Sequence, residues 1–174
     1  MKKVLSVLAI AALILVSFTS CNPNEKTYAD YLTQKKGWVL SAATSNPAYE
    51  MEDGSYVTNL MTEGYLYDFE NDYIITFNED GTEYVKPGKV VAPEDFDPEW
   101  CYRAETLIGT WSFDNDLIPA FLYMQVPFFY DAAVETCKLL SLTENELKIS
   151  CTINDDDPTA KGTYSFILTY VPAK

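Results

Sequence analysis

Apolar and polar residues alternate with a period of two over most of the chain, and this pattern constrains the fold more than any other feature. Successive side chains of a β-strand point to opposite faces, so the alternation predicts strands that each bury one face. The pattern is clearest in the last third of the chain. The apolar residues that share a face there are Leu147, Ile149, Cys151 and Ile153 in one strand and Tyr164, Phe166, Leu168 and Tyr170 in the next.

Turn signals connect these runs into hairpins. Asp80-Gly81 separates the β-prone runs 75–77 and 82–85, and an Asp-Gly pair is a strong local hairpin signal. Residues 143–145 separate the runs 137–142 and 146–153. Short strands at close spacing, about eight in all, indicate an all-β domain, either an antiparallel up-and-down barrel or a β-sandwich. We predict the barrel.

The remaining runs are less regular. Residues 38–42 place Trp38, Leu40 and Ala42 on one face, and residues 118–126 form an apolar run near two prolines. Residues 27–36 have the spacing of a short helix, which Gly37 would end. Residues 45–63 read as a loop with a helix or an edge strand. A further strand is predicted in which one face carries Leu107, Gly109, Trp111 and Phe113.

The first 21 residues carry the features of an export signal. Two lysines precede an apolar run over residues 4–16, which is too short to cross a hydrocarbon layer of roughly 30 Å as a resident helix. Small residues then lead to Cys21, as in the lipobox of bacterial lipoproteins. We predict a signal peptide over residues 1–20 and acylation of Cys21, against an ordinary secretory signal in which Cys21 is incidental. Residues 21–36 would then form the tether and the short helix, and residues 37–174 the β domain.

Charge limits the partners of the mature chain. The net charge is −14, and removal of Lys2 and Lys3 with the signal makes it −16. Such a chain is repelled by nucleic-acid phosphates and by anionic lipid heads, so we expect no nucleic-acid binding and a membrane attachment through acyl chains alone. The predicted location is the cell envelope, at the outer membrane, with the face left open.

The composition also narrows the chemistry. The chain contains no histidine, which excludes Ser-His-Asp and Cys-His catalysis and histidine-ligated metals. Acidic clusters occur at 70–72, 95–99 and 155–157 and lack EF-hand spacing, so solvated loops are favoured over Ca²⁺ sites. Two carboxylates could serve a glycosidase, but 26 acids make such a pair common by chance. We therefore predict no enzyme, no metal and no cofactor.

Three cysteines remain once Cys21 is acylated, so at most one intramolecular disulfide forms among them. Cys137 and Cys151 flank one predicted hairpin and would close a loop of about 15 residues. Cys101 follows Trp100 at a predicted strand start and is an alternative partner for either. We predict the Cys137–Cys151 pair.

The order of several short motifs resembles one protein family. Gly37-Trp38 opens a strand after a short helix, residues 73–84 carry an aromatic-Ile-Ile-Thr-Phe-Asn-x-Asp-Gly-Thr hairpin, and residues 109–113 read Gly-Thr-Trp-Ser-Phe. A leucine-rich hairpin follows over residues 139–149. Over residues 37–171 this order resembles the lipocalin-like lipoproteins of Bacteroidetes, which are related to the calycin barrels. The chain departs from the pattern in having no spacer between Gly37 and Trp38 and no basic residue at the last strand.

The resemblance implies an eight-stranded barrel with Trp38 packed across one end. The founding members of the family carry small hydrophobic ligands inside the barrel, and eight strands enclose either a filled core or one small ligand. The expected function is therefore that of a lipid-anchored lipoprotein that binds a small hydrophobic or amphipathic molecule. The alternative is a surface module that docks glycans or proteins through exposed tyrosines and acidic loops. The residues predicted to line the interior, as core or as ligand site, are Trp38, Leu40, Phe77, Trp111, Phe113, Tyr164, Phe166 and Leu168.

Overall fold

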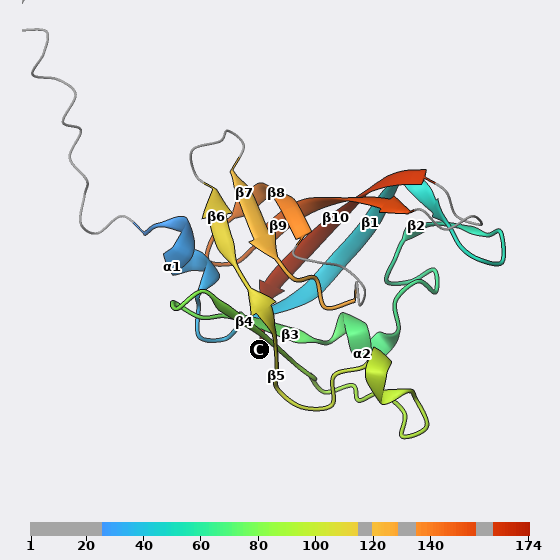
Figure 1. Cartoon of the computed structure of the whole chain (residues 1–174), viewed down its shortest axis with the longest axis horizontal. Helices are drawn as coiled ribbons and strands as arrows, with labels where there is room; N and C mark the ends of the chain where they lie inside the picture. The colour runs from blue at the N-terminus through green and yellow to red at the C-terminus, as the bar shows by residue number, and fades with distance from the viewer. Residues whose placement is uncertain (1–25, 115–119, 129–134, 156–161) are drawn as a thin grey trace, which may run out of the picture.

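The computed structural model describes residues 26–114, 120–128, 135–155 and 162–174, which fold into an antiparallel β-barrel (Figure 1). The predicted signal segment 1–20 and Cys21 lie outside these residues. The described elements, in chain order, are α1 (Tyr28–Leu32), β1 (Trp38–Glu50), β2 (Tyr56–Asn59), α2 (Asp68–Asn71), β3 (Ile74–Phe77), β4 (Thr82–Lys86), a 3-10 helix (Pro98–Trp100), β5 (Thr106–Thr110), β6 (Ser112–Asp114), β7 (Phe121–Met124), β8 (Glu135–Leu142), β9 (Leu147–Asp155) and β10 (Gly162–Pro172).

The strands follow one another around the sheet in their order along the chain. The spatial order is β5-β4-β3-β1-β10-β9-β8-β7-β6, with β2 paired to the far end of β1. Only Trp111 separates β5 from β6, so one nearly continuous segment pairs with β4 through its first half and with β7 through its second half. This segment joins the two edges of the sheet. The result is an up-and-down barrel that has eight strands when β5 and β6 are counted as one. The predicted fold class is confirmed.

The predicted hairpins also form. Residues 78–81 connect β3 to β4, and Gly81 has φ +84, a conformation that glycine adopts without steric cost. Residues 143–146 connect β8 to β9, and the Thr143 amide donates to the Glu146 carbonyl at 2.8 Å. Both turns place their strands in antiparallel register.

The N-terminal helix is shorter than predicted. Thr27 caps α1, because its hydroxyl accepts from the Asp30 amide while the Asp30 side chain accepts from the Thr27 amide. The helix ends at Leu32 rather than at Gly37. Gly37, at φ +71, instead turns the chain into β1, and a Cβ atom at this position would lie 2.7 Å from the Ile75 carbonyl oxygen.

Two breaks in strand register correct the predicted faces. The pairing of β1 with β10 shifts between Leu40 and Ala42, so Ala43 points inward and Ala42 is exposed. The pairing of β4 with β5 shifts as well, which leaves Leu107 55% exposed and turns Ile108 toward the protein. A β-bulge adds one residue to one strand and reverses the faces beyond it, which alternation alone does not reveal.

Two irregular stretches differ from the prediction. Within residues 45–63, β1 continues to Glu50 and β2 occupies Tyr56–Asn59. The apolar run 118–126 contributes only β7, Phe121–Met124, and its first two residues lie outside the described part of the chain.

The buried apolar side chains form two clusters. The larger one lies inside the barrel and includes residues from α1, β1, β3 and β7 to β10. The smaller one consists of Phe69, Tyr73, Val85, Ala92 and Cys101, and Phe96, Tyr102 and Ile108 pack against it. Val85 of the smaller cluster lies opposite Ile75 of the larger cluster in the β3–β4 pair. The two clusters are therefore neighbours, and the smaller one extends from these strands toward α2 and the connection formed by residues 87–105.

Candidate functional site

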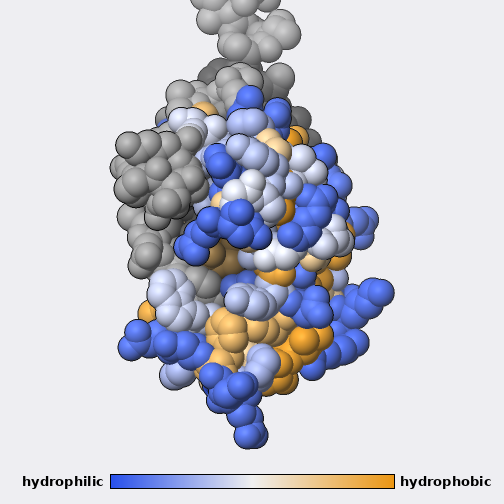
Figure 2. Space-filling view, turned by 90° about the vertical axis from the view of Figure 1, so that its right-hand side faces the viewer, coloured by the Kyte–Doolittle hydropathy of each residue, from blue (hydrophilic) through white to orange (hydrophobic). Residues whose placement is uncertain are grey.

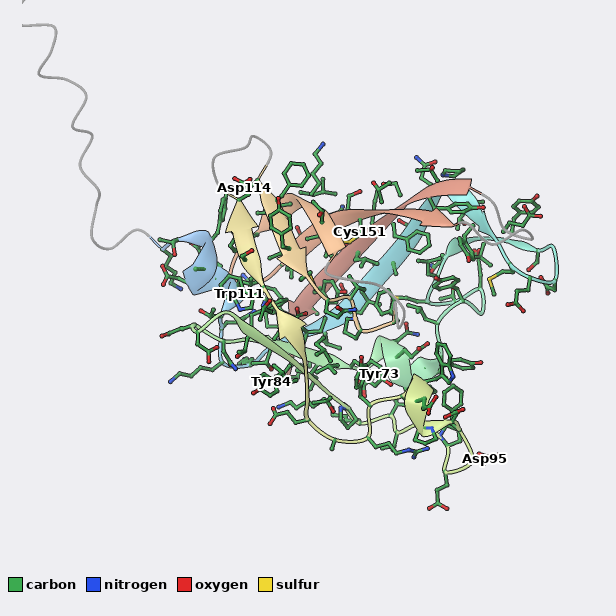
Figure 3. All side chains as sticks on the ribbon, in the orientation of Figure 1. Tyr73, Tyr84, Asp95, Trp111, Asp114 and Cys151 are labelled. Carbon is green, nitrogen blue, oxygen red and sulfur yellow. A yellow bond between two sulfur atoms is a disulfide. The ribbon has the colours of Figure 1, made fainter. Side chains whose placement is uncertain are left out.

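The barrel interior is lined by the side chains that the sequence placed there. Six of the predicted residues are buried in the larger cluster, and the other two are half-buried and pack against it. The buried six are Trp38, Leu40, Phe77, Tyr164, Phe166 and Leu168, and the half-buried two are Trp111, labelled in Figure 3, and Phe113.

Hydrogen bonds from two indoles fix the α1 end of the barrel. Trp38 is fully buried, and its Nε1 donates to the Leu32 carbonyl of α1 at 2.8 Å. Trp111 Nε1 donates to the Asn78 carbonyl of the β3–β4 turn at 2.9 Å. Its ring meets that of Phe77 edge to face, with centroids 6.0 Å apart. Buried indoles generally need such a partner for the N–H group, and these bonds tie the helix and the turn to the barrel wall.

Aromatic rings gather at the opposite end of the interior. The ring of Tyr49 lies 4.8 Å from that of Tyr164 and 5.0 Å from that of Tyr65. Phe166 lies 5.7 Å from both Tyr49 and Tyr65. Tilted and edge-to-face contacts of this kind stabilise an aromatic cluster beyond simple burial. Tyr49 comes from the end of β1 and Tyr65 from the loop before α2. Neither position belongs to an alternating run of the sequence, so neither residue was among the predicted lining residues.

One carboxyl group lies inside this apolar lining. Glu83 on β4 is fully buried, and its Oε2 accepts from the Gln125 amide at 2.9 Å. Gly109 of β5 pairs with Glu83 and lies against Gln125. Because Gly109 has no side chain, the Glu83 carboxyl can extend past it to the Gln125 amide. This bond links β4 to the end of β7 across the segment that joins the sheet edges. Burial raises the pKa of Glu83 to about 8, and the bond from Gln125 offsets this only in part.

A tyrosine hydroxyl shares the electrostatic environment of Glu83. Tyr170 on β10 is 1% exposed, and burial together with the charge of Glu83 raises its pKa. Among the described residues, neither the Tyr170 hydroxyl nor the Glu83 Oε1 atom has a hydrogen-bond partner. An unsatisfied buried polar atom costs about 1–3 kcal/mol. The interior therefore contains two polar atoms whose hydrogen-bonding capacity is unused.

The chemistry of this pair is that of hydrogen bonding. At neutral pH the raised pKa keeps most Glu83 carboxyls protonated, so Glu83 can both donate and accept, as can the phenol of Tyr170. Each of these groups could bind a polar group of an otherwise apolar ligand or an ordered water molecule. Sequence reasoning placed Tyr170 on the inner face but did not select Glu83. The signal was available, because Glu83 shares its face with Val85 and lies opposite Phe77.

Cys137 and Cys151, the predicted pair, are joined by a disulfide bond between β8 and β9. The connecting loop alone would offset the two cysteines by one position, since Leu142 pairs with Leu147. A register shift at Leu140 restores the match and sets Cys137 directly opposite Cys151. Cys101 is a buried free thiol in the smaller cluster.

Several acids of the predicted clusters bond to the backbone and stabilise local structure. Glu70 accepts from the Tyr67 amide at the start of α2, and Asp97 accepts from the Glu99 amide in the 3-10 helix. Asp72 accepts from the amides of Lys89 and Val90. Within the described residues no group of three or more acids or cysteines is arranged to hold a metal ion. Asp156 and Asp157 lie outside this part of the chain.

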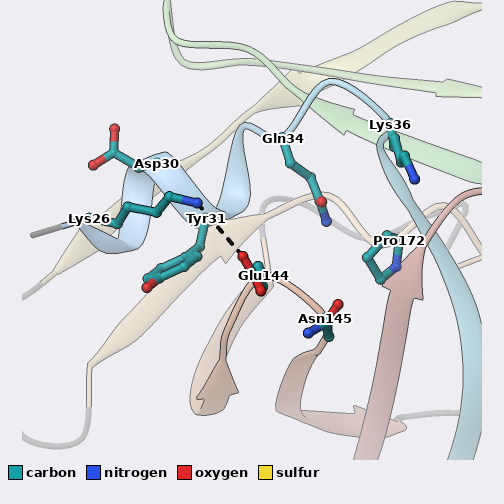
Figure 4. A pocket seen from close by; sticks show the side chains of 8 residues that line it. All are labelled: Lys26, Asp30, Tyr31, Gln34, Lys36, Glu144, Asn145 and Pro172. Carbon is teal, nitrogen blue, oxygen red and sulfur yellow. Dashed lines mark ion pairs between the residues drawn. The ribbon is translucent and has the colours of Figure 1, made fainter.

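A shallow polar depression lies beside α1 (Figure 4). It has a volume of about 300 Å³ and lies between α1 and the β8–β9 turn. Lys26 Nζ lies 3.8 Å from Glu144 Oε2 across it and 5.4 Å from the Tyr31 ring centre. These groups are largely exposed, so the ion pair is worth little, and the depression offers a ligand few buried contacts.

Comparisons of the chain with protein-family models, with curated proteins and with solved structures each found no match. Separately, no helix among the residues that the structure describes combines the length and the apolar character needed to cross a membrane.

Proposed function

We propose that the protein is a lipid-anchored lipoprotein of the cell envelope whose barrel binds a small amphipathic ligand. The observation that carries this proposal is the pair of unpartnered polar atoms, Glu83 Oε1 and the Tyr170 hydroxyl, inside an apolar and aromatic lining. An apolar enclosure with a few convergent polar groups is the usual chemistry of small-molecule sites. The ligand expected here has an apolar body and one uncharged hydrogen-bonding group.

The up-and-down topology supports the resemblance to lipocalin-like lipoproteins. Its strands follow one another around an eight-stranded barrel, in which β5 and β6 count as one strand, and Trp38 is buried against α1 at one end. The lipobox-like residues before Cys21 support the anchor, and the mature charge of −16 favours acyl chains over electrostatic attachment. The proposed location is the outer membrane.

The ligand proposal is tested by mass and by fluorescence. Native mass spectrometry of the gently purified full chain should detect a fraction with an added small-molecule mass. Titration with N-phenyl-1-naphthylamine, an apolar probe with one N–H group, should give saturable binding of one probe per chain.

Substitutions assign the polar contacts. Glu83→Gln and Tyr170→Phe should each weaken binding of the probe, because each changes one of the unpartnered groups, while Tyr56→Phe at a 64% exposed ring should leave it unchanged. A bare mass together with no saturable probe binding would refute ligand carriage.

The anchor is tested separately. Cells supplied with an alkyne-bearing fatty acid should label the wild-type chain and fail to label Cys21→Ala. Equal labelling of both chains, or no labelling of either, would contradict acylation at Cys21 and leave the ligand proposal standing.

A further inference from the structure

The connection between β4 and β5 is unlike the other hairpin loops of the barrel. β4 ends at Lys86 and β5 begins at Thr106, so 19 residues join two neighbouring strands. The β3–β4 and β8–β9 turns need only residues 78–81 and 143–146. Loops longer than about 12–15 residues without much secondary structure are uncommon in compact domains, and ordered ones often have a function.

Side-chain hydrogen bonds hold this connection in place. Arg103 donates to three backbone carbonyls of the same segment, those of Ala92, Pro93 and Phe96, at 3.3, 2.6 and 3.1 Å. Next to Arg103, the Tyr102 amide donates at 2.9 Å to the hydroxyl of Tyr73, the residue that precedes β3. The segment is thus anchored at several points along its length.

The anchored segment nevertheless exposes apolar side chains. Val90 is 44% exposed and Val91 61%. Tyr67, just before α2, is 57% exposed, and its ring stacks on Phe69 at 5.4 Å and meets Phe96 at 5.0 Å. We call Tyr67, Phe96, Val90 and Val91 the loop surface. Figure 2 shows apolar side chains gathered on the lower half of this face, over α2 and the connection, with hydrophilic side chains around them.

The charges around the loop surface are mainly negative. Residues 87–105 contain five acids and two basic residues, and one of the two, Arg103, is engaged with backbone carbonyls. The exposed acids nearest to Phe96 in the chain are Glu94, Asp95 and Asp97. A second copy of the chain would bring the same acids against these, and like charges repel. Charge complementarity therefore favours a partner with basic side chains around apolar ones.

The position of the loop surface argues against a lipid partner. α1, where the described chain begins, lies at one end of the long axis, and α2 with the connection lies toward the other (Figure 1). If Cys21 is the anchor, as proposed above, the loop surface lies at the end of the molecule far from the point of attachment. Anionic lipid heads would also be repelled by the acids. Exposed aliphatic Val90 and Val91 suit an apolar protein side chain better than a sugar ring, which binds to flat aromatic faces.

We propose that the loop surface is a docking site for a segment of another protein that carries lysine or arginine around apolar residues. The apolar centre would bury Val91 and Tyr67, and the acidic rim would pair with the basic side chains of the partner. This site is separate from the barrel interior and does not depend on ligand binding there.

The test uses fluorescent peptides of twelve residues in which apolar and basic content vary independently. Fluorescence anisotropy with the purified full chain should give binding to apolar-basic peptides that is at least about tenfold tighter than to apolar-acidic ones. This binding should weaken as salt is raised, since exposed charges are screened.

Matched variants locate the binding. Val91→Asp and Tyr67→Ala should weaken binding about tenfold or more, while Leu140→Asp and Tyr56→Ala, at other exposed positions, should not. Glu94→Gln with Asp95→Asn should reduce the salt dependence. Circular dichroism of each variant checks that the barrel is folded.

Competition distinguishes the other occupants. Binding of the protein itself to anionic lipid bicelles, lost in Val91→Asp and Tyr67→Ala, would overturn the proposal in favour of a membrane. Displacement of the peptide by neutral oligosaccharides would overturn it in favour of a glycan. Equal binding of basic and acidic peptides, or binding unaffected by Val91→Asp and Tyr67→Ala, would also overturn it. None of these results bears on acylation of Cys21 or on probe binding in the barrel.

Discussion

The wall formed by β8, β9, β10 and β1 and the connection between β4 and β5 are stabilised in different ways. In the wall, nine consecutive residue pairs join β9 to β10, from Asp155–Gly162 to Leu147–Tyr170. In the connection, regular pairing is replaced by bonds from side chains to the backbone, those of Arg103, Asp72 and Asp97. The wall buries most of its inward side chains, whereas the connection leaves Val90 and Val91 exposed.

This difference separates the tasks of the two regions. Backbone pairing and burial give the wall a stability close to that of the whole fold, because both are lost only on global unfolding. The connection depends on fewer and more exposed bonds, so it can vary without loss of the barrel. We expect substitutions in the wall to change global stability and those in the connection to change local opening or partner binding.

The largest expected effect comes from the centre of the wall. Phe166→Ala removes a fully buried ring and should lower the free energy of unfolding by about 3–5 kcal/mol, measured by urea denaturation. Phe96→Ala, in the smaller cluster, should cost only about 1 kcal/mol because that ring is half-buried. Similar losses for both variants would remove the distinction between the two regions.

Reduction of the disulfide should have the next largest effect. Cys137 and Cys151 are 14 positions apart, and opening a loop of this size costs about 3 kcal/mol in the chain-entropy model. Urea midpoints with and without a reductant measure this loss, and Cys101→Ser, which leaves the bridge intact, should show the same sensitivity. A midpoint unchanged by reductant would show that the bridge adds nothing to the wall.

The buried carboxyl links stability to pH. Its pKa is about 8 in the folded chain against 4.5 for an ordinary glutamate, so between these values the folded chain retains a proton that the unfolded chain has lost. The stabilisation that Glu83 contributes is complete below pH 4.5 and decreases as pH rises toward 8, by roughly 1 kcal/mol for each pH unit between these values.

Glu83→Gln keeps an acceptor for the Gln125 amide and should remove this decrease, as seen in urea denaturation at pH 5, 6, 7 and 8. Glu79→Gln, at an exposed position in the β3–β4 turn, is the matched control and should retain it. An unchanged pH profile in Glu83→Gln would show that the carboxyl is not buried as described.

The smallest global effect is expected in the connection. Arg103→Lys removes the planar fork that reaches the carbonyls of Pro93 and Phe96, so amides within residues 92–103 should exchange faster with solvent. The global free energy of unfolding should fall by less than about 1 kcal/mol. Hydrogen exchange with mass spectrometry measures the exchange of these amides, and urea denaturation measures the free energy of unfolding. Unchanged exchange in this segment would contradict its dependence on Arg103.

Sequence reasoning predicted the features that local chemistry determines. Period-two alternation indicated the strands, and Asp80-Gly81 marked a hairpin. The inward side chains of β9 and β10 were predicted because alternate residues of a strand point to the same face. The order of the strands around the barrel came from the resemblance and the number of runs, since alternation alone also allows a sandwich.

The features that it missed depend on tertiary contacts. The bulge before Ala42 and the shift at Leu140 are single-residue changes of register, and no residue type in the sequence specifies them. Glu83 was missed because a lone acid in an alternating run is read as solvent-exposed. Its position on the face of Val85 indicates burial, but the residues that accommodate the carboxyl, Gly109 and Gln125, come from β5 and the end of β7 and are revealed only by the tertiary structure.

The barrel depends on one segment that pairs with both edges of the sheet, and nuclear magnetic resonance tests this most directly. Contacts between backbone protons of Glu83 and Gly109, and of Phe113 and Leu122, should be observed together in one monomeric chain. The amides in both pairs should be protected from exchange to a similar degree. Observation of only one set, with rapid exchange along the other edge, would mean an open sheet and would contradict the enclosed interior proposed as the ligand site.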